Sequence, residues 1–237
     1  KYVVRSGMGN KPVIAVDFGS AARFANWLQN GQNGPGTTEY GTYTFDSVWS
    51  TNSDNLIRNE GAIWFIPSED EWYKAAYYDP NKPGGPGYWE YPTKSNTVPY
   101  LSPPPGNDAP DPTNVAKYTT DWSDTDITEV GAYTQAVGPW GTYDQGGNVE
   151  EWNDTTFGNG AYRGLRGGSA QNLFEGLHSS FQGGNYPESR GYFDSYPYGF
   201  RVATIYTEEV PEPSTLALFA IGLVSLIALA RRRNRKA

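Results

Sequence analysis

The amino-acid sequence predicts an α+β domain that is irregular and rich in loops. Two segments carry apolar residues at helical spacing, and four short runs carry β-forming residues. Glycine (28 residues) and proline (18 residues) are abundant, so turns and loops should join these elements. With 237 residues, of which 15% are aromatic, the chain has enough material for one sizeable hydrophobic core.

The first helix is predicted directly after Ser20, over the stretch "AARFANWLQN". Gly31 follows this stretch, where a helix often ends in a left-handed residue. The apolar residues that share its predicted buried face are Ala21, Phe24, Ala25 and Leu28.

The second helix is predicted within "PSEDEWYKAAYYDP". Ser68 and Glu71 have the spacing of a capping box, in which each side chain bonds the backbone of the other residue. Asp79 precedes Pro80 and should end the helix, because the residue before a proline avoids the α region. The predicted buried stripe consists of Trp72, Ala75 and Ala76.

Short β-strands are expected at residues 62–66, 130–134, 162–166 and 199–206. The stretch "RGLRGGS" predicts a strand that enters a glycine turn, with Arg166 paired to an acidic residue at the edge of the core. Between these runs, "PNKPGGPG" and "SPPPGNDAPDP" are typical of loops.

Charge and cysteine content exclude several classes of function. Residues 231–237 hold five of the 18 basic side chains, so residues 1–230 carry 13 basic against 26 acidic groups, a net charge of −13. A body this acidic is repelled by phosphate backbones, so we expect no nucleic-acid partner. The absence of cysteine excludes disulfides, thiolate metal sites and cysteine nucleophiles within these residues.

The C-terminal segment has the pattern of a membrane helix. Residues 214–230 are apolar and uncharged over 17 positions, which is at the short end of the length that crosses a bilayer. The basic end, residues 231–237, should then lie in the cytoplasm and the acidic body on the other side of the membrane. Since the chain starts at Lys1 without an apolar signal, we interpret it as a fragment that lacks its natural start.

The same segment resembles a known sorting signal. Val210, Pro211, Glu212 and Pro213, one apolar span and a terminal arginine run are similar to the PEP-CTERM tail of Gram-negative bacteria. The resemblance implies recognition and cleavage by an exosortase. It also implies export to the cell surface or the extracellular matrix after transient anchoring in the inner membrane.

The body resembles the formylglycine-generating-enzyme family, also called the sulfatase-modifying factor domain. Five phrases carry the resemblance in order over residues 10–204: "AARFANWL", "PSEDEWYKAAYYDP", "YDQGGNVEEWND", "RGLRGGSAQN" and "GFRVA". The implied fold is irregular, of the α+β class and related to C-type lectins. We therefore expect residues 1–207 to be such a domain without its N-terminal part, and residues 208–237 to be the sorting tail.

A cluster of acidic residues suggests a metal site. Four carboxylates fall within "YDQGGNVEEWND": Asp144, Glu150, Glu151 and Asp154. Calcium takes six to eight oxygen ligands from carboxylates and backbone carbonyls on loops that bend around it, although a solvated acidic turn would have the same spacing. The resemblance implies calcium bound by the side chains of Asp144 and Glu151 and by the carbonyls of Gly147 and Val149. The family commonly has tryptophan at the position of Glu150.

The resemblance also implies a second calcium site, at Asn114 and the carbonyl of Val115. An aspartate further along the chain would complete it, and Asp121, Asp124 and Asp126 all remain candidates.

No catalytic residue is assigned from the sequence. Catalytic members of the family use two cysteines to bind copper(I), and the matching positions here are Asn172 and Leu177, which supply no thiolate. A related branch uses three iron-binding histidines, whereas this chain has one, His178. His178 beside Ser179 and Ser180 is read as a structural histidine, because adjacent residues of a strand point to opposite faces.

Two functions remain open. The first is an exported, calcium-stabilised and non-catalytic module, which binds glycans or proteins through the aromatic-rich residues 185–200; those rings equally suit a core. The alternative is an oxidoreductase of the same superfamily, of the formylglycine-generating or metal-dependent oxidase type, whose chemistry does not depend on cysteine.

Overall fold

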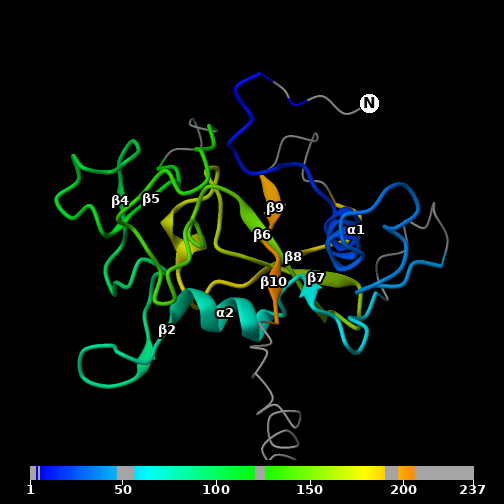
Figure 1. Ribbon diagram of the computed structural model, residues 1–237. Coiled ribbons are helices and arrows are strands. Elements are labelled where there is room, and N and C mark those ends of the chain that lie inside the picture. Colours follow the sequence, from blue (N-terminus) through cyan, green and yellow to red (C-terminus); the bar gives the residue numbers. More distant parts are fainter. Residues whose placement is uncertain (1–3, 5, 47–55, 121–125, 190–196, 206–237) are drawn as a thin grey trace, which may run out of the picture. The chain divides into compact units, whose positions relative to one another are not determined.

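The computed structural model describes residue 4 and residues 6–46, 56–120, 126–189 and 197–205. The chain divides into two units, Lys1–Thr204 and Ile205–Ala237. The first unit contains the helices and strands described below (Figure 1). No helix within the described ranges is long and apolar enough to cross a membrane, and residues 214–230 lie outside those ranges.

A four-stranded sheet forms the centre of the first unit, with the order β8-β7-β6-β9 (Figure 1). Its strands are β6 (Glu150–Phe157), β7 (Tyr162–Arg166), β8 (Gly183–Asn185) and β9 (Tyr198–Phe200). β6 pairs with β7 antiparallel, with Trp152 opposite Leu165, and with β9 parallel. β7 pairs with β8 antiparallel.

Three short pairs of strands surround this sheet. The antiparallel pairs are β1 (Trp64–Phe65) with β10 (Ala203–Thr204), and β2 (Tyr78–Asp79) with β3 (Gly87–Tyr88). The parallel pair is β4 (Tyr100–Leu101) with β5 (Val115–Ala116), and a 3₁₀ turn covers Phe174–Leu177. The described chain is therefore an α+β fold with much irregular structure, as the sequence predicts.

Helix α1 (Phe18–Gln29) begins earlier than the sequence prediction. Its N-cap is Asp17, whose carboxylate accepts the backbone N–H of Ser20 at 2.6 Å, so Ser20 lies inside the first turn. The shift places the buried stripe on Phe18, Ala21, Ala22 and Ala25.

Two residues of the predicted stripe of α1 differ in burial from the prediction. Phe24 is 40% exposed, and Leu28 is half-buried. The ring of Phe24 packs beside the stripe, against Trp27 and Phe200.

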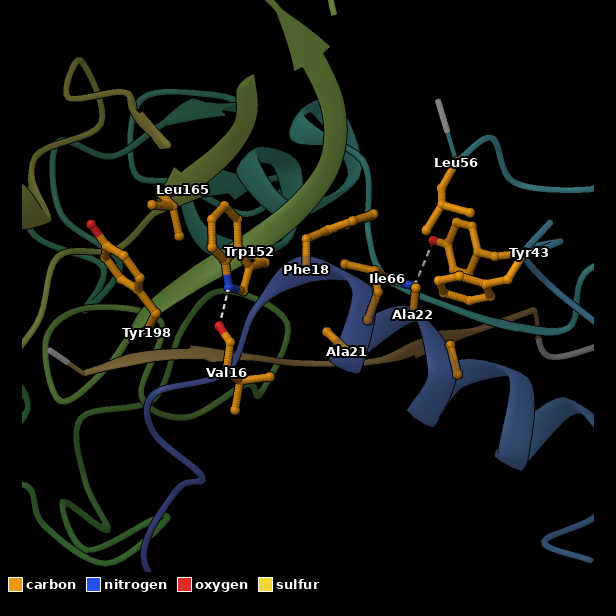
Figure 2. Packing of buried hydrophobic residues seen from close by; sticks show 12 residues of the cluster. Val16, Phe18, Ala21, Ala22, Tyr43, Leu56, Ile66, Trp152, Leu165 and Tyr198 are labelled. Carbon is orange, nitrogen blue, oxygen red and sulfur yellow. Dashed lines mark hydrogen bonds between the residues drawn. The ribbon is translucent and has the colours of Figure 1, made fainter. Parts of the chain in front are cut away.

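The main core lies between α1 and one face of the sheet (Figure 2). Trp152 is fully buried, and its ring meets the ring of Phe18 edge-on at a centroid distance of 6.3 Å. Its indole N–H donates to the carbonyl of Val16 at 2.7 Å, so the one polar atom of the ring is satisfied. On the other side of the cluster, the hydroxyl of Tyr43 accepts the N–H of Ile66. Burying an apolar side chain such as that of Phe18 stabilises the fold by about 1.5–3 kcal/mol.

Helix α2 (Glu69–Tyr77) confirms the predicted capping box and packs against the opposite face of the sheet. Ser68 accepts the N–H of Glu71, and the Glu71 carboxylate accepts the N–H of Ser68. Trp72 and Ala76 are buried, as predicted, whereas Ala75 is half-buried. The helix ends at Tyr77, and β2 holds the residues before the proline.

The strand predictions have mixed outcomes. Residues 162–166 match β7, residues 62–66 contain β1, and the run from 199 contains most of β9 and all of β10. The strand predicted at 130–134 is wrong, because Gly131 has a φ of 70° and the N–H of Ala132 returns to the carbonyl of Glu129 in a turn. β6 is the longest strand of the described residues and was not predicted, since its acidic start reads as a loop.

Candidate functional site

The four clustered carboxylates do not share one environment, because three of them, Glu150, Glu151 and Asp154, belong to strand β6. Successive side chains of a strand point to opposite faces of its sheet. Glu150 therefore shares a face with Trp152, on the α1 side, and Glu151 points to the α2 side. The repulsion expected from the sequence is reduced by this alternation.

Glu151 is neutralised by Arg201, which follows β9. The Nη2 of Arg201 donates to Oε1 of Glu151 at 2.6 Å, and its Nε donates to Oε2. The indole N–H of Trp72 also donates to Oε2, at 2.7 Å. Burial alone would lower the pKa of the Arg201 guanidinium, but the charge of Glu151 and its hydrogen bonds raise it. Glu151 is thus a buried side chain whose two carboxylate oxygens both accept hydrogen bonds.

Asp144 lies near this ion pair, at the start of the acidic segment. Its Oδ2 accepts the N–H of Gly131 at 2.6 Å. Burial raises the pKa of the Asp144 carboxyl and Glu151 raises it further, while the Gly131 N–H and Arg201 oppose the shift. Asp144 and Glu151 are therefore close enough to repel each other, with Arg201 near both.

A small cavity adjoins Asp144. Its volume is about 10 Å³, which is room for about one water-sized particle. Its polar lining includes Asp144, Gln145 and Asn148, and its backbone lining includes Gly146. A hard cation prefers oxygen ligands of this kind.

The chain between the two acids is held closely on both sides. The N–H of Gly147 donates to the carbonyl of Gly167, and the N–H of Asn148 donates to the carbonyl of Lys117, both at 2.8 Å. Gly147 has a φ of 78°, and a Cβ there would lie 2.0 Å from the carbonyl oxygen of Lys117. The side chain of Val149 is buried. The predicted ligands Asp144, Gly147, Val149 and Glu151 thus lie on a rigid segment.

The second predicted site has other local partners. The Oδ1 of Asn114 accepts the hydroxyl of Thr93 at 2.6 Å, and its Nδ2 donates to the carbonyl of Thr97. Val115 belongs to β5 and is buried. Asp126 is exposed, and Asp121 and Asp124 lie outside the described residues.

No group of three or more His, Cys, Asp or Glu side chains in the described part of the chain is placed to hold a metal ion. Both predicted calcium sites therefore depend on backbone carbonyls and an amide in addition to one or two carboxylates. Carboxylate, carbonyl and amide oxygens are the types of ligand that calcium binds. At the first site, the Glu151 carboxylate would have to be shared between the ion and Arg201.

Asp154, the last of the four clustered carboxylates, belongs to a second network of ion pairs and hydrogen bonds. Arg58 donates to its Oδ2 from Nε at 2.9 Å, and the hydroxyl of Tyr43 donates to the same atom at 3.2 Å. Arg58 also binds the carboxylate of Glu71 at the start of α2. Burial raises the pKa of Asp154, and the charge of Arg58 opposes this. The sequence reasoning missed Arg58 and Arg201, which lie 96 and 50 residues from their partners.

The positions that carry thiols in catalytic relatives have structural roles here. Leu177 is fully buried against Tyr91, Ala116 and Tyr118. Asn172 accepts the hydroxyl of Ser169 through Oδ1 at 2.6 Å, within the turn after β7. At the two positions where the resemblance implies metal-binding thiols, one side chain therefore packs in the core and the other forms a turn.

The "RGLRGGS" stretch behaves as predicted. β7 ends at Arg166, and Gly167 and Gly168 form the following turn. The guanidinium of Arg166 donates from Nε to Oε1 of Glu69 at 2.6 Å. The predicted acidic partner is thus the first residue of α2.

The His178 side chain contacts Ser180. The reasoning from strand geometry did not predict this contact, because the segment is a turn rather than a strand. Its Nδ1 lies 2.8 Å from the hydroxyl of Ser180 and accepts the backbone N–H of the same residue at 3.1 Å. Its Nε2 lies 3.7 Å from Oε2 of Glu90, and the Glu90 side chain is 55% exposed. The doubled contact with Ser180 is that of a side chain stabilising its own turn.

Three aromatic rings form a row across the ends of β6, β7 and β8. Phe157 and Tyr162 face each other across the β6–β7 pair, with ring centroids 5.6 Å apart, and Tyr186 follows at 4.8 Å from Tyr162. Phe157 is 38% exposed and Tyr186 is 50% exposed. Gly184 makes room for the tip of the Phe157 ring, because a Cβ there would lie 1.8 Å from Cζ. We call Phe157, Tyr162 and Tyr186 the aromatic row.

The aromatic-rich residues 185–200 divide between the surface and the core. Tyr186 lies in the aromatic row, whereas Tyr198 belongs to the main core and packs against Trp152. Residues 190–196 lie outside the described residues.

Comparisons with known proteins agree on the family and the fold. The PEP-CTERM protein-sorting motif matches residues 209–235, which implies recognition by exosortase-type sorting machinery and an exported protein. Treponema denticola variable protein 1 is similar at 21% identity, with a TM-score of 0.56, over 86% of this chain and 74% of that chain. The crystal structure of CarF is similar at 20% identity, with a TM-score of 0.57, over 86% of this chain and 72% of that chain.

These two likenesses show the fold alone, and a comparison with curated proteins found no match. A family model described as "Sulfatase-modifying factor enzyme 1-like domain" matches residues 3–205, which is most of the chain and includes all the elements of the first unit. The chain therefore belongs to the sulfatase-modifying factor family, with formylglycine-generating-enzyme-like structure, and carries a PEP-CTERM sorting signal at its C-terminus.

Proposed function

We propose that this exported chain is a calcium-stabilised, non-catalytic binding module of the cell surface or extracellular matrix. The observation that carries the binding role is the aromatic row, where three rings lie together at the surface of a rigid sheet. Aromatic rings offer large contact areas with little loss of side-chain freedom, and the hydroxyls of Tyr162 and Tyr186 add polar contacts. The ligand would be a glycan or a protein.

The tail would serve export only. Residues 214–230 would anchor the chain briefly in the inner membrane with its C-terminus in the cytoplasm, until the sorting machinery removes the tail.

The non-catalytic role rests on the two positions that would bind copper in relatives. Leu177 fills a core cluster and Asn172 closes a turn, and neither side chain is a soft ligand for copper(I). Elemental analysis of the purified chain tests this part. We expect calcium without a stoichiometric redox metal, and one bound redox metal per chain would favour the oxidoreductase alternative instead.

Calcium is proposed at Asp144, Glu151 and the carbonyls of Gly147 and Val149, with a second ion at Asn114 and Val115. The support is the half-buried Asp144 carboxyl, whose pKa burial raises, beside a cavity with room for about one water-sized particle. An ion present at 100 times its dissociation constant would stabilise the fold by about 2.7 kcal/mol. For a chain of this length, that free energy raises the melting temperature by roughly 5–10 °C.

The calcium test compares melting temperatures with excess calcium and with a chelator. We expect the full difference in the parent chain and in a control with exposed Asp108 changed to Asn, and a smaller difference in Asp144→Asn, which retains only the proposed second ion. Calorimetry that detects no calcium binding, together with equal melting temperatures in both buffers, would refute the proposal.

The binding role is tested by screening the chain on glycan arrays and in pull-downs from the producing cells. Tyr186→Ala should weaken any ligand found, whereas Tyr40→Ala, which removes an equally exposed ring outside the aromatic row, should leave binding unchanged. Blank screens, or equal loss in both variants, would contradict the role of the aromatic row.

A further inference from the structure

The sequence contains three asparagine–glycine pairs, and the structure places them in different environments. The pairs are Asn30-Gly31, Asn33-Gly34 and Asn159-Gly160. In such a pair the backbone nitrogen of the glycine can attack the side-chain amide of the asparagine, because glycine has no Cβ that shields its nitrogen. Whether a pair reacts in the folded protein therefore depends on how firmly its two reacting groups are held.

Both reacting groups of the first pair are held by hydrogen bonds. Asn30 is the C-cap of α1, and its Nδ2 donates to the carbonyls of Thr37 and Tyr40 at 2.8 and 2.7 Å. The N–H of Gly31 donates to the carbonyl of Leu28 at 3.0 Å. These hydrogen bonds would have to break before the two groups could react, which slows the reaction.

The second pair is held at one of its two reacting groups. The Nδ2 of Asn33 donates to the carbonyl of Asn30 at 2.5 Å, whereas the N–H of Gly34 makes no hydrogen bond to a described residue. The backbone of Asn33 is also fixed, because its carbonyl accepts the indole N–H of Trp27 and the hydroxyl of Thr37. This pair should therefore react more slowly than a pair without such restraints.

The third pair lies in the turn between β6 and β7, where neither reacting group is held. Asn159 is exposed, and within the described residues its side chain and the N–H of Gly160 have no hydrogen-bond partner. Glycine also precedes this pair, and the φ values of Gly158, Asn159 and Gly160 are 61°, 59° and 90°. No described atom beyond the adjoining residues lies within 4 Å of a Cβ built on Gly160, so the chain has space to rotate.

We propose that Asn159-Gly160 is a site of spontaneous deamidation in the folded protein. The nitrogen of Gly160 loses its proton and bonds to Cγ of Asn159, the bond from Cγ to Nδ2 breaks, and ammonia leaves. Water then opens the five-membered ring that has formed. Opening at Cγ leaves aspartate, and opening at the main-chain carbonyl leaves isoaspartate, whose backbone runs through Cβ and Cγ. No atom is oxidised or reduced, and water is the only co-reactant.

The conversion would change the surface beside the aromatic row. A carboxylate would lie two residues from Phe157 and three from Tyr162, and isoaspartate would lengthen the main chain between β6 and β7 by one carbon. The ring of Tyr162 contacts the segment that changes, because a Cβ on Gly158 would be 2.6 Å from its Cδ2. The inference goes beyond the proposed binding role and does not depend on it.

The test follows all three pairs in the same chain. The full chain in mild detergent is kept at pH 8, once folded and once in concentrated guanidinium chloride, and its proteolytic peptides are analysed by mass spectrometry over time. Water enriched in oxygen-18 labels the new carboxylate. In the folded protein we expect Asn159 to convert about tenfold faster than Asn30 or more, because two hydrogen bonds restrain the Asn30 amide. In guanidinium chloride the three pairs should convert at similar rates, because these hydrogen bonds are lost.

A variant at Asn159 makes the test specific to the turn. Asn159→Gln should stop the conversion there, because the longer side chain would have to close a less favourable six-membered ring, and should leave the rate at Asn33 unchanged. An unchanged melting temperature shows that the variant still folds.

Three outcomes would overturn the proposal. The first is no conversion at Asn159 in the folded protein, and the second is conversion at Asn30 that is as fast as at Asn159. The third is aspartate without isoaspartate, because attack by the Gly160 nitrogen gives both products. These outcomes leave the calcium and aromatic-row tests unaffected.

Discussion

Glu150 is an acidic residue whose removal should stabilise the protein at pH values where its carboxyl would otherwise be charged. It is 5% exposed and faces the α1 side of the sheet. Its Oε1 lies against the backbone of β8, because a Cβ on Gly183 would be 2.6 Å away. Burial is the cause that raises the pKa of the Glu150 carboxyl from 4.5 to about 7. The carboxyl is therefore neutral in the folded protein under mildly acidic conditions.

The sign of the pH dependence follows from this direction. The unfolded chain releases the Glu150 proton near pH 4.5, whereas the folded chain retains it until about pH 7. The contribution of the Glu150 carboxyl to the free energy of unfolding is therefore full below pH 4.5 and is lost as the pH rises through 7. A difference of about 2.5 pKa units corresponds to about 3 kcal/mol of unfolding free energy.

The perturbation is Glu150→Gln, which has the same shape and no titration. Urea unfolding followed by tryptophan fluorescence, from pH 4 to pH 8.5, measures the free energies. We expect the variant to gain about 3 kcal/mol relative to the parent between the two ends of this range. Other titrating groups, such as Asp144 and Asp154, are common to both proteins and cancel in the difference. Glu60→Gln, at an exposed position, should show no such gain.

A difference between Glu150→Gln and the parent that stays constant from pH 4 to pH 8.5 would refute the reasoning. It would mean that the folded carboxyl titrates at the same pH as the unfolded one, so that burial does not disfavour its charge.

Three further substitutions test the packing around the candidate site. Arg201→Met should lose about 3–5 kcal/mol in urea unfolding, because Glu151 then stays buried without its cation, and adding Glu151→Gln to the same chain should recover most of this loss. Gly147→Ala should lose about 3 kcal/mol or more in melting experiments, because its φ is positive and its Cβ would meet a carbonyl oxygen. Gly85→Ala, with a positive φ but open space around it, should lose clearly less. Ser68→Ala should lose about 1 kcal/mol through the N-cap of α2, measured by the same melting experiment.

The parts of the fold that depend on neighbours in sequence were predictable. Ser68 and Glu71 are three residues apart, and their reciprocal bonds need only a helix between them. β7 was placed at its observed bounds, since its apolar residues end at a glycine pair. The start of α1 was placed three residues late because Asp17 and Ser20 are both good N-caps, and only the packing of Phe18 against Trp152 selects the first.

The elements that depend on distant partners were not predictable. β6 begins with two acids, and acidic residues are depleted in strands, above all where both faces of the strand are covered. Here α1 covers one face and α2 the other, while Arg201 supplies a cation from 50 residues away. The predicted strand at 130–134 had suitable side chains, but Gly131 adopts a turn conformation that the pattern of β-branched and aromatic residues does not reveal.

The calcium site remains a prediction, and the charge balance of its acidic segment was not foreseen. Spacing indicated that Asp144 and Glu151 approach each other, and their mutual effect on the pKa of Asp144 agrees with this. Spacing could not indicate that Arg201 pairs with Glu151, or that Arg58 pairs with Asp154. A sequence contains no local signal for such pairs.

This charge balance decides which substitution tests the calcium proposal cleanly. Removing the Glu151 carboxylate would also leave the half-buried Arg201 without its partner, so a loss of stability would follow whether or not calcium binds. Among the residues that the structure describes, no arginine forms an ion pair with Asp144, and Asp144 lines the small cavity. Because burial already disfavours its charge, Asp144→Asn in the absence of calcium should be neutral or stabilising. A variant that is as stable as the parent in chelator, but gains less from calcium than the parent does, would attribute the lost part of the effect to the ion at Asp144.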